Sequence, residues 1–359
     1  GFYLRNDQQI AELGRYCSYV YIDPLKCEEP DDVVIPFEPI STAALAPRNV
    51  QHDVADEIPW ARQALKATHS AVRTLIQDVR NGEVPQLASL HAGLLPMVDS
   101  VQRSPDALIW LLRTEALHGH LYRRAVGTSV TATVFGHRLG FDEDTLMELA
   151  LGGVLLDIGK IALPVPILAK PQALTPEEHG LVKRHVDHAL TVVREIPHLP
   201  ERSIDMVSSH HERFDGSGYP FNQRGTEIPL FARIAGIVDT FDALTLERHY
   251  APAISAHNAL RYLDGQRKAK FDGALMQEFV QAVGIYPTGT WVELLDGTVG
   301  VVCAQDRRGP LAPRVAVISD ANHQPLAPRI VAVTRANPII NARHRSDQGM
   351  LPPDLEAIA

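Results

Sequence analysis

The chain has 359 residues, of which 45% are hydrophobic, so it is long enough for about two or three domains with sizeable cores. Its formal net charge of -9 argues against nonspecific binding to nucleic acid, so an anionic ligand would need a local basic site. No run of about 18 apolar residues occurs, so we expect no membrane span. Three scattered cysteines, Cys17, Cys27 and Cys303, argue against a disulfide framework and favour a cytoplasmic location.

Residues 1–58 are predicted to form a small α+β domain followed by a linker. A short helix containing Ile10 and Leu13 precedes Tyr19–Ile22, which is β-branched and aromatic and is ended by Pro24, as expected of a strand. A second strand is predicted at Val33–Phe37, within a stretch rich in Pro, Asp and Glu.

Helices are predicted for most of residues 59–285. Connecting helices at 59–104 carry an apolar stripe that ends before Asn81, Gly82 and Pro85, and its members are Leu65, Val72, Leu75, Ile76 and Val79. Ser104-Pro105-Asp106 predicts the start of one long helix running towards Phe135, with Ser104 as its cap. Thr175-Pro176-Glu177-Glu178 predicts another start with capping-box spacing, and the following stripe of Leu181, Val182, His185, Ala189 and Val192 places His185 on a buried face. Further helix is predicted through Leu260–Leu263 and Leu275–Val283.

The last segment, 286–359, changes to a strand pattern and is predicted to be a small β subdomain with a tail. Trp291–Leu295 and Val299–Cys303 flank Asp296-Gly297, which is a hairpin signal, and further strands are predicted at Val315–Ile318 and Ile330–Val333. The chain is therefore expected to be mainly α, with a helical domain at 105–285.

Two short segments concentrate residues that bind metals and anions. Residues 209–220 read Ser-His-His-Glu-Arg-Phe-Asp-Gly-Ser-Gly-Tyr-Pro, and Leu156-Asp157-Ile158-Gly159-Lys160 lies upstream. Imidazole nitrogens and carboxylate oxygens are ligands of transition metals, and a lysine nearby suits an anionic substrate.

These motifs resemble the HD-GYP family, a bacterial branch of the HD superfamily of metal-dependent phosphohydrolases. The resemblance extends from about Pro105 to Tyr250 and includes Arg233-Ile234, Asp239, Asp242 and Arg248. It implies an HD-superfamily helical bundle that handles the second messenger cyclic di-GMP in bacterial signal transduction. Residues 1–58 are similar to the small domain of unknown function often fused to HD-GYP domains.

The resemblance implies two metal subsites, of which this sequence retains one. The second subsite is complete as Asp157, His185, His210 and His211. The first keeps Asp157 and Asp239, but Leu156 and Arg124 stand where the family has histidines. We hypothesise that the Arg124 guanidinium occupies the place of the first metal and pairs with one or both aspartates. One divalent transition metal, Fe, Mn, Ni or Zn, is then expected. Alternatively His120, one turn earlier, is a substitute ligand and a weakened two-metal site persists.

The resemblance also implies residues that contact the ligand. Asp157 and Lys160 are the expected catalytic residues, and Lys160, Tyr219 and Arg248 are expected to bind cyclic di-GMP or its linear product. Tyr219 can stack on a guanine base. The Gly-Tyr-Pro loop is the expected contact with GGDEF-domain proteins.

Three functions remain open from the sequence. The main expectation is a degenerate HD-GYP module that binds cyclic di-GMP or a partner protein with weak or no phosphodiesterase activity, because the first subsite is lost. The first alternative is an active phosphodiesterase using one metal or a rearranged two-metal site. The second is an interaction module for GGDEF-type proteins that needs no nucleotide.

Overall fold

The computed structural model describes residues 52–115, 120–246, 254–266, 269–305, 312–343 and 351–358. The chain divides into two compact units between Arg48 and Asn49, and all the described residues belong to the second unit. The helix and strands predicted within residues 1–58 therefore lie outside the described residues.

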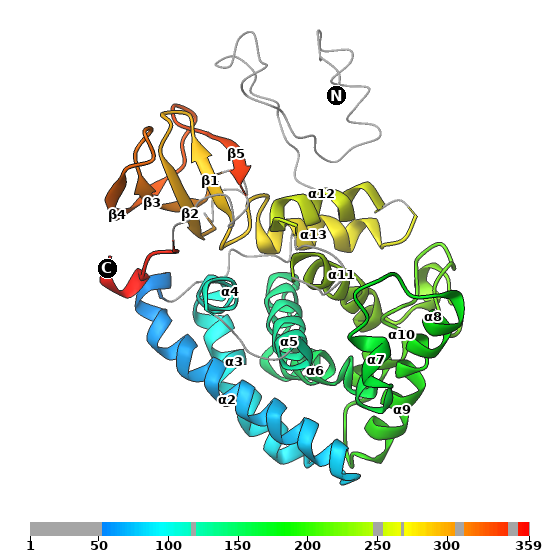
Figure 1. The fold of residues 1–359 in the computed structure, drawn as a ribbon. Helices are drawn as coiled ribbons and strands as arrows, with labels where there is room; N and C mark the ends of the chain where they lie inside the picture. The colour runs from blue at the N-terminus through cyan, green and yellow to red at the C-terminus, as the bar shows by residue number, and fades with distance from the viewer. Residues whose placement is uncertain are drawn as a thin grey trace. The chain divides into compact units, whose positions relative to one another are not determined.

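Helices make up most of the described chain (Figure 1). They are α2 (Val54–Asn81), α3 (Leu87–Arg103), α4 (Pro105–Thr114), α5 (His120–Leu139), α6 (Glu143–Leu155), α7 (Val165–Leu168), α8 (Pro176–Lys183), α9 (His185–Glu195), α10 (Glu201–Ser209), α11 (Leu230–Thr245), α12 (Ala256–Gln266) and α13 (Gly273–Val283). Single 3₁₀ turns are η2 (Ile158–Ala162), η3 (Gly225–Glu227) and η5 (Leu355–Ala357).

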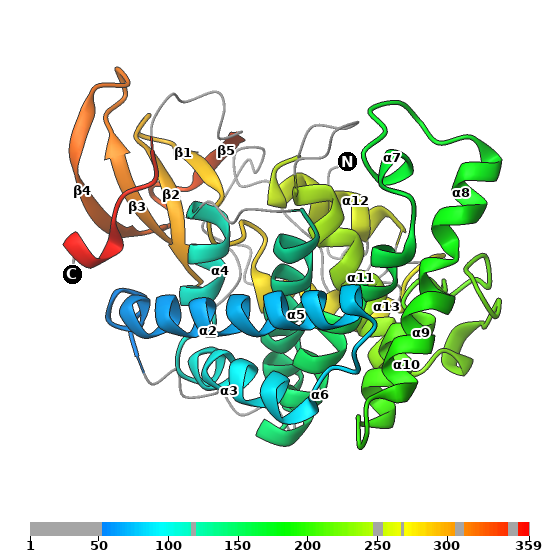
Figure 2. The ribbon, with the colours of Figure 1, turned by 60° about the horizontal axis from the view of Figure 1, so that its bottom comes forward.

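Helices α2 and α3 form an antiparallel pair that lies beside α4 and α5 (Figure 2). The predicted stripe of α2 is buried at Leu65, Val72, Leu75 and Ile76. The helix ends at Asn81 because Gly82 adopts the left-handed conformation and its N–H bonds back to Asp78 and Val79.

The single helix predicted from Pro105 to Phe135 is wrong, since the chain forms α4 and α5 instead. Backbone at Glu115 is extended, and its carboxylate accepts from Arg62 Nε of α2 at 2.8 Å, which favours an end of α4 at this point. The start at Pro105 is confirmed, but the Ser104 side chain makes no capping bond. Because α5 is a separate helix, it can run between two hydrophobic cores, contributing Val126 to one and Phe135 to the other.

The helix that carries His185 is also divided. The capping box at Thr175 is confirmed, but α8 ends at Lys183 and α9 begins at His185, with Arg184 as the shared cap. The break turns Leu181 outwards, where it is 41% exposed, while His185 is buried as predicted. The prediction that Leu181 belongs to the same buried stripe as His185 is therefore wrong.

The C-terminal sheet is antiparallel with strand order β4-β3-β2-β1-β5. Its strands are β1 (Trp291–Leu294), β2 (Val299–Ala304), β3 (Arg314–Ser319), β4 (Pro325–Ala332) and β5 (Ile339–Arg343). The hairpin at Asp296-Gly297 is confirmed, with Gly297 at φ 82° and Trp291 opposite Val301. Strand β5 was not predicted. It is a short edge strand that pairs only with β1, so its sequence lacks the apolar pattern of a central strand.

Asp106 of α4 ties this sheet to the helices. Its carboxylate accepts from Thr288 Oγ1 at 2.5 Å and from the Gln305 backbone N–H at 3.0 Å. One face of the sheet, including Trp291 and Val301, shares a core with the helices, and the opposite face packs around Val292 and Val302. The fold is thus mainly helical with a packed C-terminal sheet, as predicted.

Candidate metal centre

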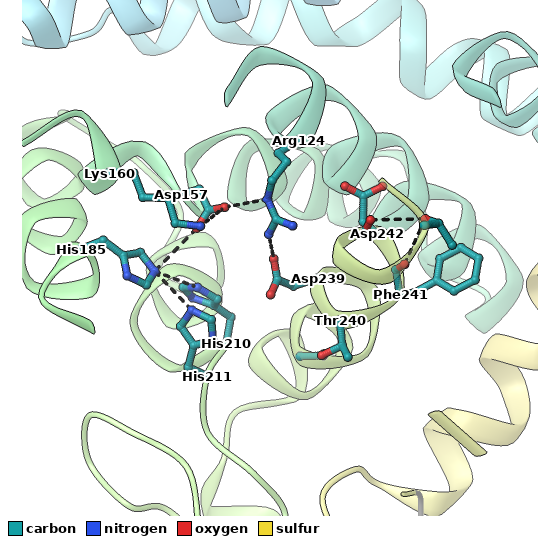
Figure 3. Close-up of polar contacts among 12 residues, drawn as sticks. Arg124, Asp157, Lys160, His185, His210, His211, Asp239, Thr240, Phe241 and Asp242 are labelled. Carbon is teal, nitrogen blue, oxygen red and sulfur yellow. Dashed lines mark hydrogen bonds and ion pairs between the residues drawn. The ribbon is translucent and has the colours of Figure 1, made fainter. Parts of the chain in front are cut away.

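Three imidazole rings converge where the start of α9 lies beside the end of α10 (Figure 3). His185 is the first residue of α9, and His210 and His211 follow the last residue of α10. One nitrogen of each ring lies within 4.8 Å of the other two. The Nε2 atom of His185 is 3.5 Å from that of His210 and 3.2 Å from that of His211.

Backbone carbonyls set the orientation of two of these rings. The Nδ1–H of His185 donates to the Val182 carbonyl at 2.7 Å, and the Nδ1–H of His210 donates to the Val207 carbonyl at 2.9 Å. Each Nε2 lone pair therefore points towards the other rings, which is how metal-binding histidines are commonly held. Burial lowers the pKa of all three imidazoles, to about 4 for His210. The rings are therefore neutral at pH 7, which is the form that binds metals.

Asp157 adds a carboxylate to this cluster. Its Oδ1 lies 3.6 Å from His185 Nε2 and is buried without a hydrogen-bond partner, while its Oδ2 accepts from Lys160 Nζ at 2.7 Å. Burial alone raises the pKa of the Asp157 carboxyl, but the positive charges of Lys160 and Arg124 outweigh it and hold that pKa well below its usual range. The carboxylate is therefore ionised, with one oxygen turned towards the imidazoles.

Two glycines of the motifs allow the backbones around the cluster to approach closely. A Cβ at Gly159 would lie 2.0 Å from the His185 carbonyl oxygen, so only glycine lets η2 sit against α9. A Cβ at Gly218 would lie 2.4 Å from the backbone of Glu212. These contacts bring Asp157 next to His185 and fold the Gly-Tyr-Pro loop back onto the histidine pair.

Arg124 lies between two aspartates on the other side of the cluster (Figure 3). Its Nε donates to Asp157 Oδ2 at 3.0 Å and its Nη2 donates to Asp239 Oδ1 of α11. Arg124 is 4% exposed and its Nη1 is buried without a partner. Burial raises the pKa of the Asp239 carboxyl, but the Arg124 charge outweighs this and lowers it overall. One guanidinium thus joins carboxylates 33 and 115 residues away along the chain.

Leu156 contributes only packing. It is 1% exposed and lies in the core formed by α5, α6 and α11 to α13. Asp242, one turn after Asp239, packs its carboxylate against Gly127 of α5, where an added Cβ would be 3.0 Å from Oδ1. Burial raises the pKa of Asp242 to about 6.

The Gly-Tyr-Pro loop covers one edge of the triad. Tyr219 stacks on His211 with ring centroids 4.7 Å apart and an interplanar angle of 22°. The buried Glu212 carboxylate holds the loop by accepting from the backbone N–H groups of Phe221 at 2.6 Å and Gln223 at 3.1 Å. Lys183 Nζ lies 4.8 Å from the Tyr219 ring centroid. Sequence reasoning missed Lys183, whose only local signal is its position two residues before His185.

Two predicted site residues cannot be placed. Arg248 lies outside the described residues, and His120 is the first residue of α5 with a side chain that is not described.

The donor set fits a transition metal. Three neutral imidazole nitrogens and the partnerless Asp157 Oδ1 form a buried, oriented group of nitrogen and oxygen ligands of the kind such ions take. The arrangement therefore provides a candidate metal site on the histidine side of Asp157, while Arg124 supplies the cation on the other side.

Comparison with known proteins identifies the family. Residues 111–275 match the family model "HD domain", and residues 1–90 match "Domain of unknown function (DUF3391)". The chain is 32% identical over 325 residues to the cyclic di-GMP phosphodiesterase PA4108 of Pseudomonas aeruginosa, covering 89% of this chain and 78% of that protein. The chain belongs to the HD-GYP-type cyclic di-GMP phosphodiesterase family.

Two further proteins are also similar to this chain. The cyclic di-GMP phosphodiesterase response regulator RpfG of Xanthomonas campestris pv. campestris is 34% identical over 243 residues, which are 67% of this chain and 63% of RpfG. Among solved structures, "Bd1817, a HDG"Y"P protein from Bdellovibrio bacteriovorus", has a TM-score of 0.52 at 17% identity, covering 62% of this chain and 70% of that one. This last likeness concerns the fold alone. Among the described residues, no helix is both long and apolar enough to cross a bilayer.

Proposed function

We propose that this HD-GYP domain binds cyclic di-GMP at a centre with one divalent transition metal, and that it hydrolyses the phosphodiester slowly or not at all. His185, His210, His211 and Asp157 would hold the ion. The observation that carries the proposal is the position of Arg124, whose guanidinium bonds to both Asp157 and Asp239.

Electrostatics supports a single ion. Asp157 and Asp239 are both buried, and two ionised carboxylates in a dry site need a cation between them. Arg124 already supplies that charge, and its planar group forms hydrogen bonds with both carboxylates. A second metal ion beside it would bring two further positive charges into the same space.

Residues around the ion would set the charge and the orientation of its ligands. A metal at the imidazole side can lower the pKa of a bound water to about 7. Lys160 and Arg124 keep Asp157 ionised by their charges, and the carbonyls of Val182 and Val207 keep two imidazoles in the ligand tautomer. With Arg124 fixed between the aspartates, the first subsite would lack the ion that clamps the phosphodiester in a two-metal reaction.

A second candidate is an active cyclic di-GMP phosphodiesterase, as the sequence also left open. The names of the relatives favour it, because PA4108 and RpfG are both named as such enzymes and similarity to PA4108 covers 89% of this chain. Hydrolysis would then proceed with one metal or with a rearranged site.

Metal analysis together with ligand assays separates the two candidates. The full chain is loaded in turn with Mn²⁺, Fe²⁺, Ni²⁺ and Zn²⁺, its metal content is measured by mass spectrometry, and binding and hydrolysis of cyclic di-GMP are followed by calorimetry and chromatography. We expect one ion per chain, saturable binding and little linear product. Sustained hydrolysis, with either one or two ions per chain, would refute the proposal in favour of the active enzyme. Absence of both metal and nucleotide binding would refute both candidates.

A further inference from the structure

Two lysines lie beside the imidazole triad, and they differ in how their charges are engaged. Lys160 Nζ donates to Asp157 Oδ2 at 2.7 Å, so its charge is offset by a buried carboxylate. Lys183 is exposed at the end of α8 and its Nζ lies over the ring of Tyr219. Within the part of the chain that the structure describes, Lys183 has no ion pair with a carboxylate.

The position of Lys183 is tied to the candidate metal centre by two features. Its ammonium lies 4.8 Å from the Tyr219 centroid, and Tyr219 in turn stacks on His211. The break at Arg184 also makes Lys183 the last residue of α8 and His185 the first of α9, so the same short turn sets both. The Lys183 ammonium group therefore contacts the same tyrosine ring that stacks on one imidazole of the triad.

We propose that Lys183 binds a phosphate group of the dinucleotide at this centre, an inference that rests on the proposed function. Lys160 would have to leave a buried carboxylate to meet a phosphate, whereas Lys183 would leave only an aromatic face. A cation–π contact on an exposed side chain is weaker than a charge-assisted hydrogen bond to phosphate. Exchanging the contact with Tyr219 for a hydrogen bond to a phosphate oxygen is therefore favourable for Lys183. Lys183 is thus the lysine available for first contact.

The phosphate could belong to a cyclic phosphodiester or to the terminal phosphate of a linear dinucleotide. Both offer anionic oxygens to an ammonium group, and the linear form carries the higher charge. Calorimetric titrations with cyclic di-GMP and with its linear product distinguish them, since Lys183 affects most strongly the ligand whose phosphate it contacts.

The experiment compares four full-length proteins at two salt concentrations: the native chain, Lys183→Met, Lys183→Arg and Arg184→Met. We expect Lys183→Met to weaken binding about tenfold, at the low end for a hydrogen bond to a charged group, and the difference to narrow at high salt. Lys183→Arg should retain most of the affinity. Arg184→Met is the matched control, because it removes an exposed cation from the next position and should change affinity little.

Metal content separates a direct contact from damage to the site. Lys183→Met should bind the same amount of Mn²⁺ as the native chain, because Lys183 is not among the ligand atoms of the triad. Equal affinities of native and Lys183→Met proteins for both dinucleotides would overturn this inference and leave the proposed function standing. Equal losses in Lys183→Met and Arg184→Met would also overturn it, since only the general charge would matter. If the native chain binds neither dinucleotide, the proposed function fails and this inference fails with it.

Discussion

Replacing Arg124 with Met should leave the buried Asp239 carboxylate without its cationic partner and so destabilise the folded protein. Asp157 would keep Lys160 as a partner at 2.7 Å, whereas Asp239 would lose the cation to which it is bound. Removing one partner of a buried ion pair typically costs about 3–5 kcal/mol, because the remaining charge stays out of water. We therefore expect the free energy of unfolding to fall by about this amount at pH 7.

The loss of unfolding free energy in Arg124→Met should become smaller as the pH falls. In the native chain the pKa of Asp239 is lowered, so its contribution to stability is present above the unfolded pKa and is lost as the pH falls through the folded one. In Arg124→Met burial acts without the guanidinium and raises that pKa, so the folded variant is penalised above the unfolded value. The difference between the two proteins should be largest near pH 7 and should shrink as the pH falls towards about 4.

Urea unfolding, followed by tryptophan fluorescence and circular dichroism at several pH values, measures the free energy of unfolding of the native chain and of Arg124→Met. Arg138→Met is the matched control in the same helix, because Arg138 pairs with Glu278 at 3.1 Å and is partly exposed, so its loss should cost at most about 1 kcal/mol. Mn²⁺ should stabilise Arg124→Met more than the native chain, since Asp239 is left without its cation and Asp157 loses one of its two cationic partners. A loss no larger than that of the control, with no dependence on pH, would refute the electrostatic account of Arg124.

Three further outcomes are expected. The double variant Arg124→His with Leu156→His should raise the metal content from one ion per chain to two and increase hydrolysis of cyclic di-GMP; an unchanged metal content would show that these two positions are not the lost subsite. His210→Ala should abolish metal binding measured by mass spectrometry, whereas His188→Ala, on α9 outside the triad, should leave it intact; metal retention in His210→Ala would remove this residue from the ligand set. Gly159→Ala should lower the free energy of unfolding by about 1–3 kcal/mol, because its Cβ would meet the His185 carbonyl; Gly180→Ala, in α8 with open space around it, should be neutral or slightly stabilising, and equal effects of the two would contradict the close-approach argument.

Much of the local structure could be predicted because its signals lie within a few residues. The Thr175 capping box, the end of α2 at Gly82 and the Asp296-Gly297 turn are each set by contacts between near neighbours, and each was predicted from the sequence. The breaks at Glu115 and Arg184 were missed. The carboxylate of Glu115 is engaged by Arg62, 53 residues earlier in the chain, and such a partner leaves no local pattern.

The candidate site shows the same division. The sequence by itself determined the residue types, the histidine pair and Asp157, and it led to the expectation that Arg124 and Leu156 stand where the family has histidines. Only the tertiary structure decided that Arg124 meets Asp157 and Asp239 together and that Lys183 lies over Tyr219. Such contacts depend on how α5, α8 and α11 pack, because a long side chain can reach several partners and burial decides which charges must be paired.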